Sequence, residues 1–206
     1  MVIQKPTVYF KMKPETIHIA IFASGAGSNA QKIIDYFKNS TKVEISVIVC
    51  NNPDAGILKI AANESIPVLM IEKQMFRNTG YVAELKNYKI QLIVLAGFLW
   101  KIPPVLIEHF KNKIVNIHPA LLPAYGGKGM YGNAVHSAVL AAKEKISGIT
   151  IHFVDEKYDH GKIIFQSTCP VDENDTVASL AQKIHKLEHA SYAREIEKLI
   201  DNTESI

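Results

Sequence analysis

The chain has 206 residues, of which 48% are hydrophobic and 21% charged, and its formal net charge is +3. This composition is that of an ordinary globular protein, and it excludes a collagen-like or disordered chain. Lysine and arginine are scattered without a run of five or more, which argues against nucleic-acid binding. No apolar run approaches the ~20 residues that span a bilayer, so we do not expect a membrane protein.

The cysteines and the N-terminus bear on the cellular compartment. Cys50 and Cys169 are far apart and lack metal-type spacing. They favour a reducing compartment over a disulfide framework, so we expect a cytoplasmic protein. Residues 1–13 contain lysines but no apolar core of the kind that a secretion signal needs. We interpret residues 1–16 as an N-terminal extension that precedes a single domain at 17–206. Residues 1–13 are expected to be dispensable for stability and activity.

Strand and helix patterns alternate through the first part of this domain. The strands are short apolar runs, and the helices carry apolar residues at helical spacing or open with a proline. This alternation predicts a doubly wound, mostly parallel α/β sheet of the Rossmann-like kind, with helices on both faces. Strands are expected at 17–23, 43–50, 67–71, 91–96 and 114–117, and helices at 28–39, 55–65, 81–88 and 103–110.

The last part of the chain follows a different pattern. Residues 149–154 and 162–169 are strand-like and joined by a polar turn, which predicts an antiparallel hairpin at the sheet edge. Residues 177–200 show one long amphipathic pattern, typical of a helix packed on the domain. Asp175 or Thr176 can cap this C-terminal helix.

A glycine-rich loop, Gly25-Ala26-Gly27-Ser28-Asn29-Ala30, joins the first strand to the first helix and fits the G-x-G-x-x-G/A dinucleotide fingerprint. A dinucleotide site needs an acidic residue at the end of the second strand, but Asn51-Asn52-Pro53 stands there and Asp54 follows the proline. A phosphate site needs only the N–H groups of a helix N-terminus and donors such as Ser28 and Asn29. A tight turn that binds nothing is the third alternative. The pattern favours an anion site and leaves the other two open.

The fifth predicted strand ends in Asn116-Ile117-His118-Pro119. Residues two apart in a strand face the same way, so Asn116 and His118 are expected to point together. They would lie at the carboxyl end of the sheet, where α/β proteins bind ligands. An amide and an imidazole there can stabilise a developing oxyanion and transfer a proton. The alternative is a polar pair that is tied into neighbouring loops.

Further titratable residues lie on the predicted hairpin and on the last helix. Three acids and two histidines fall between residues 152 and 160, and a carboxylate there is expected to raise the pKa of His118. The alternative is a solvated turn. His185 and His189 are four apart, which suits a metal, but no third ligand is evident and we expect none bound.

Four segments together carry a resemblance to a known family. They occur in the order and spacing of the phosphoribosylglycinamide formyltransferases, and the resemblance covers about residues 17–200. The pattern of Asn-x-His with a distant Asp is the most specific of them for folate-dependent formyl transfer. The segments are Ser24-Gly25-x-Gly27-Ser28-Asn29, Leu95-Ala96-Gly97-Phe98, Asn116-Ile117-His118-Pro119-x-Leu121-Leu122-Pro123, and Gly148 followed by Asp159 and Gly161.

The resemblance implies formyl transfer from the co-substrate 10-formyltetrahydrofolate to the amine of phosphoribosylglycinamide, in purine synthesis. It implies a phosphate-binding half at about 17–115 and a catalytic, folate-binding half at about 116–200. The catalytic trio would be Asn116, His118 and Asp159. Asn116 and protonated His118 would stabilise the oxyanion, and Asp159 would keep His118 charged and help to move the amine's proton. The residues implied to bind phosphoribosylglycinamide are Gly27, Ser28, Asn29, His185 and Glu188. Those implied to contact folate are Arg77, Leu99, Trp100, Lys101, Ile102, Asn116, Asp155, Glu156, Lys157, Tyr158 and Asp159.

Two features depart from the family pattern: Trp100 stands where many members have an arginine, and the glycine-rich stretch 124–132 differs from the commonest sequence. Formyltetrahydrofolate hydrolases share the trio, but they usually carry a regulatory domain that 13–16 leading residues cannot supply. A transfer-RNA formyltransferase would need a further C-terminal domain. An alternative of another class is a dinucleotide-binding regulatory module. We expect small-molecule substrates, no nucleic-acid or membrane partner, and a monomer or homodimer.

Overall fold

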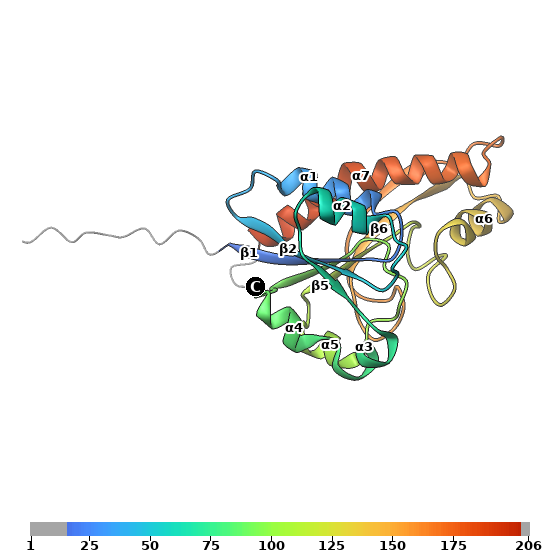
Figure 1. Cartoon of the computed structure of the whole chain (residues 1–206). Helices are drawn as coiled ribbons and strands as arrows, with labels where there is room; N and C mark the ends of the chain where they lie inside the picture. Colours follow the sequence, from blue (N-terminus) through green and yellow to red (C-terminus); the bar gives the residue numbers. More distant parts are fainter. Residues whose placement is uncertain (1–15, 203–206) are drawn as a thin grey trace, which may run out of the picture.

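The computed structural model describes residues 16–202, which form one seven-stranded sheet with helices on both faces (Figure 1). The predicted extension up to residue 15 lies outside the described residues. The strands are β1 Ile17–Ala23, β2 Val43–Cys50, β3 Val68–Met70, β4 Leu92–Leu95, β5 Ile114–His118, β6 Ile146–Phe153 and β7 Ile163–Pro170. The helices are α1 Ser28–Phe37, α2 Ile57–Asn63, α3 Lys73–Thr79, α4 Val82–Asn87, α5 Pro104–His109, α6 Asn133–Ala141 and α7 Val177–Asp201.

The strand order is β3-β2-β1-β4-β5-β6-β7. All neighbours from β3 to β5 are parallel, whereas β6 runs antiparallel to both β5 and β7. The chain therefore builds outward from β1 in one direction and then from β4 in the other. This confirms the predicted doubly wound, mostly parallel sheet with an antiparallel edge hairpin. Ligands of such sheets bind at the carboxyl ends of the strands where the order reverses, which here is between β1 and β4.

Both faces of the sheet are buried, and this explains why its strands are unbroken apolar runs. Successive residues of β1 enter opposite cores: Ile21 packs into the core beneath α1 and α7, and Phe22 packs into the core with α3, α4 and α5. In Figure 1, α1, α2 and α7 lie on one side of the sheet and α3, α4 and α5 on the other. The parallel strands thus place the loops after β1, β4 and β5 together at the carboxyl end of the sheet.

The structure contains two helices that the sequence did not predict. Helix α3 buries only Phe76, so it has no apolar stripe to reveal it. Helix α6 follows the glycine-rich stretch and buries one short face that includes His136. The predicted C-terminal helix is confirmed as α7, capped by Thr176 in a reciprocal bond with Ser179. No helix within residues 16–202 is long and apolar enough to cross a membrane.

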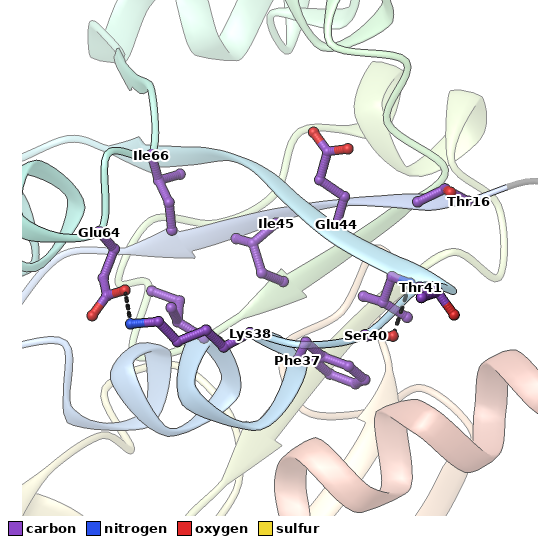
Figure 2. Close-up of a pocket in the computed structure, with 11 residues that line it drawn as sticks. Thr16, Phe37, Lys38, Ser40, Thr41, Glu44, Ile45, Glu64 and Ile66 are labelled. Atoms are coloured by element: carbon purple, nitrogen blue, oxygen red, sulfur yellow. Dashed lines mark hydrogen bonds and ion pairs between the residues drawn. The ribbon is translucent and has the colours of Figure 1, made fainter.

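A cavity of about 430 Å³ lies at the amino ends of β1 and β2, which is the opposite end of the strands from these loops (Figure 2). Its charged side chains are paired, because Lys38 Nζ lies 2.9 Å from Glu64 Oε2. The Ser40 hydroxyl accepts hydrogen bonds of 3.1 Å from the N–H groups of Lys42 and Val43. Both members of this ion pair and this hydroxyl therefore have partners within the protein.

Candidate active site

The glycine loop after β1 leaves a helix N-terminus open. Gly27 has a φ of +83°, and a Cβ there would lie 2.9 Å from Ile57 Cδ1, so both backbone conformation and space call for glycine. No side chain caps the first turn of α1 within the described residues. The N–H groups of that turn, together with Ser28 and Asn29, border a large cavity. This is the arrangement that binds phosphate.

The end of β2 lacks the carboxylate of a dinucleotide site. Asn52 Nδ2 instead donates to the Ser24 carbonyl at 3.2 Å, and Asn52 Oδ1 accepts from the Asp54 N–H at 3.0 Å. The Asn52 side chain thus bonds to the main chain just before the glycine loop and to the main chain of its own turn. This geometry favours the phosphate interpretation of the loop over the dinucleotide one.

Helix α7 brings a buried acid to the same loop. Glu188, which is 5% exposed, accepts a hydrogen bond of 3.0 Å from Asn29 Nδ2. Its Oε2 also lies 2.8 Å from His185 Nδ1, and this hydrogen bond raises the pKa of His185. Asn29 Oδ1 is buried without a partner among residues 16–202. The residues implied to bind the phosphoribosyl group therefore lie together around one end of the cavity.

The predicted catalytic trio also comes together. Asn116 and His118 end β5, and Asp159 lies in the turn between β6 and β7. His118 Nδ1 is 3.6 Å from Asp159 Oδ2, which in turn accepts a 2.9 Å hydrogen bond from the Gly127 N–H. His118 Nε2 lies 2.8 Å from the Tyr125 carbonyl oxygen. Because a carbonyl only accepts, Nε2 carries the proton and Nδ1 faces Asp159 with its lone pair when the ring is neutral.

His152 is a fourth member of this cluster, and no motif in the sequence indicated a separate role for it. It lies on β6 directly opposite Asn116. His152 Nδ1 is 2.8 Å from the Phe153 carbonyl, so Nδ1 carries the proton and Nε2 accepts from Asn116 Nδ2 at 3.1 Å. This bond uses one amide hydrogen of Asn116 and leaves the second for a ligand. The antiparallel register of β5 and β6 is the signal that could have found His152.

The charge state of His118 beside Asp159 differs from the one that the resemblance implied. The pKa of His118 is lowered, chiefly by burial and to a smaller extent by His152, although Asp159 and the Tyr125 carbonyl raise it. The carboxylate therefore acts in the predicted direction, but the net shift contradicts the charged His118 that the resemblance implied. Burial alone would raise the pKa of Asp159, but His152, His118 and the Gly127 N–H together lower it. In the free protein at neutral pH, Asp159 is charged and His118 is neutral.

The residues around the glycine loop and the residues of the trio line one cavity of about 790 Å³. Leu99 and Tyr158, 56% and 43% exposed, lie on its wall, and Lys101 Nζ lies 5.8 Å from the centre of the Tyr158 ring. Trp100 lines the cavity and packs against Phe76 and Phe98. The other predicted folate contacts on the wall are Lys101, Ile102, Asn116, Asp155, Lys157 and Asp159.

Two predicted folate contacts do not line this cavity. Arg77 lies on α3 with its side chain exposed, and Glu156 is exposed on the β6–β7 turn. Asp155, which does line it, is already bonded to His160 Nδ1 at 2.7 Å and to the Lys157 N–H at 2.8 Å. The structure thus brings together most, but not all, of the predicted site.

Comparison with known proteins decides the family. The sequence pattern described as Formyl transferase matches residues 17–196, which is most of the chain. The chain belongs to the formyl transferase family.

Individual members of this family are similar over the same region. A chloroplastic phosphoribosylglycinamide formyltransferase of Vigna unguiculata is 41% identical over 189 residues, which cover 89% of this chain and 61% of that protein. The Bacillus subtilis phosphoribosylglycinamide formyltransferase is 36% identical, over 88% of this chain and 93% of that one. The crystal structure of the Bacillus halodurans enzyme superposes with a TM-score of 0.82 at 34% identity, covering 91% and 97% of the two chains. The chain spans less than two thirds of the plant relatives, 61% and 64% of their lengths.

This formyl transferase has further cavity residues that the sequence did not indicate. The stretch Gly127–Gly132 forms part of the wall, and His136 on α6 is 3% exposed. Burial lowers the pKa of His136, and its Nδ1 has no hydrogen-bond partner within residues 16–202. No sequence signal marked this residue, because α6 itself was not predicted. Within the same residues no three His, Cys, Asp or Glu side chains gather as a metal-ligand group.

Proposed function

We propose that this formyl transferase moves the formyl group of 10-formyltetrahydrofolate to the amine of phosphoribosylglycinamide, giving the N-formyl product and tetrahydrofolate. One observation carries the proposal: a single cavity joins the open N-terminus of α1 to Asn116, His118 and Asp159. A phosphate held at one end would place an attached amine toward the trio. The names of the similar proteins support phosphoribosylglycinamide as the formyl acceptor.

Each substrate has a matching end of the cavity. The phosphate would accept hydrogen bonds from the first turn of α1, and Glu188 would exchange Asn29 for the ribose hydroxyls. The folate would lie between the loop 99–102 and the turn 155–159. Each end of the cavity contains residues from both predicted halves of the domain. The phosphate end combines α1 of the first half with Glu188 of the second. The folate end combines the loop 99–102 of the first half with the turn 155–159 of the second.

The charge states support a stepwise proton transfer. The amine nitrogen attacks the formyl carbon, and the carbonyl oxygen becomes an oxyanion that accepts the free amide hydrogen of Asn116. Neutral His118 accepts the amine proton at Nδ1, and Asp159 at 3.6 Å stabilises the imidazolium. As the tetrahedral intermediate collapses, the bond from carbon to folate nitrogen breaks and the proton passes to that nitrogen. The transfer is direct, without a covalent enzyme intermediate.

An assay of tetrahydrofolate release tests the proposal. We expect release from 10-formyltetrahydrofolate only when phosphoribosylglycinamide is added. Equal release without it would identify a hydrolase, in which water is the acceptor. Equilibrium binding of NAD without any release would identify the dinucleotide-binding module instead.

The remaining parts of the proposal concern the setting of the reaction. We propose that it uses small molecules without a metal ion, in a monomer or homodimer. The cytoplasm is the proposed compartment, although the plant relatives are named as chloroplastic proteins. Fractionation of the source cells and sedimentation of the purified chain would test these two points.

A further inference from the structure

Tyr192 on α7 is a buried tyrosine whose hydroxyl lies among main-chain carbonyls. Its exposed fraction is 1%, and its hydroxyl lies 2.9 Å from the Leu95 carbonyl oxygen and 3.2 Å from that of Val115. Burial raises the pKa of this hydroxyl well above its ordinary value, so it keeps its proton and acts as the donor. The hydroxyl therefore bonds to two different strands at once.

These two carbonyls lie next to the active site. Leu95 is the last residue of β4, immediately before the loop that leads to residues 99–102. Val115 directly precedes Asn116 on β5. The strands are neighbours, and Leu95 pairs with Asn116 in their register. One hydroxyl thus contacts the strand that leads to the predicted folate loop and the strand that carries the catalytic amide and imidazole.

The same helix also holds the phosphate loop. Glu188 precedes Tyr192 by one turn of α7, so both face the sheet, and Glu188 accepts the hydrogen bond from Asn29. The other buried side chains of this helix face, such as Ile184 and Ile196, are apolar. A phenylalanine would fill the space of the Tyr192 ring, whereas a buried hydroxyl costs stability unless it is bonded. The hydroxyl is what distinguishes this position from the apolar positions of the helix face.

We propose that Tyr192 is a positioning residue for the transfer reaction. Its hydroxyl fixes the ends of β4 and β5 relative to each other and to α7, and so fixes the folate loop relative to Asn116 and His118. This inference rests on the proposed function. Displacement of reacting groups by about 1 Å can cost on the order of 100-fold in rate, so loss of this bond is expected to lower kcat. Binding of phosphoribosylglycinamide, through Asn29 and Glu188, is expected to change little.

The test compares Tyr192→Phe with Tyr81→Phe. Tyr81 is also buried, and its hydroxyl accepts a 3.0 Å hydrogen bond from the Glu72 N–H in the core on the other face. Each substitution removes one buried hydroxyl and keeps the ring, so both are expected to lower the melting temperature by a similar few degrees. We expect Tyr192→Phe to lower kcat by about 10-fold or more, with the KM for phosphoribosylglycinamide within about twofold. Tyr81→Phe should keep both constants within about twofold.

A second measurement does not depend on turnover. The pKa of His118 measured by proton NMR is expected to shift in Tyr192→Phe and to match the unsubstituted chain in Tyr81→Phe. Of the two hydroxyls, Tyr192 bonds to β5, whereas Tyr81 bonds to the Glu72 N–H. Equal kcat in the two variants, or an unshifted titration in Tyr192→Phe, would overturn the positioning role. Absence of formyl transfer by the unsubstituted chain would instead refute the proposed function, and the titration would still decide whether Tyr192 positions His118.

Discussion

The two ends of the sheet each hold a cavity, and they differ in how their polar groups are satisfied. At the amino end, Lys38 is paired with Glu64 and the Ser40 hydroxyl is used by the backbone. At the carboxyl end, Asn29 Oδ1 and His136 Nδ1 are buried without partners in the described part of the chain, and His118 has a lowered pKa. Unsatisfied buried groups cost stability and persist where a ligand can satisfy them. The state of its polar groups, as well as its larger volume, distinguishes the candidate site.

The largest effect is expected from the trio at the carboxyl end. His118→Asn or Asp159→Asn should lower turnover at least about 100-fold, the usual loss when one stabilising group is removed from a reaction centre. Asp159 has a φ of +51°, which asparagine also tolerates, so the turn should keep its shape. Kinetics and the melting temperature of each variant check this. Near-normal turnover in either one would refute the catalytic assignment.

A smaller and more specific effect is expected at the phosphate end. Glu188→Gln keeps an acceptor for Asn29 but removes the charge that would bind the ribose hydroxyls. The KM for phosphoribosylglycinamide should rise about 10-fold, the scale of one hydrogen bond to a charged group, with a smaller change in kcat. Glu195→Gln is the matched control, since Glu195 lies on the same helix and pairs with Lys198. Equal changes in the two variants would contradict a binding role for Glu188.

The pH dependence of activity reports the charge states at the carboxyl end. His118 must be neutral to accept the amine proton, and its pKa is lowered by burial. Activity should therefore be lost only as pH falls through this lowered pKa, so the acidic limb of kcat/KM should lie below about pH 6.5, the ordinary value for histidine. Asp159, whose pKa is also lowered, stays charged through this range. Loss of activity as pH rises through the histidine range would show instead that His118 works in its charged form.

The sign of the accompanying stability change follows from the same shift. The unfolded chain binds the His118 proton more readily than the folded chain, because the folded pKa is the lower one. The contribution of this group to stability is therefore present above the ordinary histidine pKa and is lost as pH falls below it. Thermal melts of the unsubstituted chain and His118→Asn across this range would show the difference.

The smallest effect is expected at the amino end. Lys38→Met removes an exposed ion pair with Glu64, and such pairs contribute little to stability. Turnover should stay within about twofold and the melting temperature should hardly move. A several-fold loss of turnover would show that the second cavity communicates with the first and would remove the contrast between the two ends.

The sequence predicted the sheet well because both of its faces are buried. Strands such as β1 and β4 are then unbroken apolar runs that a single sequence reveals. Helices α3 and α6 escaped prediction because each buries few residues, and their apolar patterns are too short to detect. Arg77 lies on α3, so its position relative to the cavity could not be deduced without that helix.

The trio could be predicted because its members carry a specific motif, but its electrostatics could not. His152 becomes visible only through the pairing of β5 with β6, which fixes which side chain lies beside Asn116. The net pKa shift of His118 depends on how completely the loops around it exclude water. Sequence spacing identifies neighbouring charges but carries no measure of burial at this position.

The bond between His118 Nε2 and the Tyr125 carbonyl has a consequence for how the enzyme can vary during evolution. Every residue offers a carbonyl, so the imidazole itself requires no particular side chain at position 125. The φ of +55° at Tyr125 still disfavours β-branched residues there. A steric constraint falls on the next position as well. A Cβ at Gly126 would lie 2.5 Å from Leu122 Cδ2 and 3.2 Å from Asp159 Cβ. A change at this glycine would therefore be felt at the imidazole through the shape of the main chain.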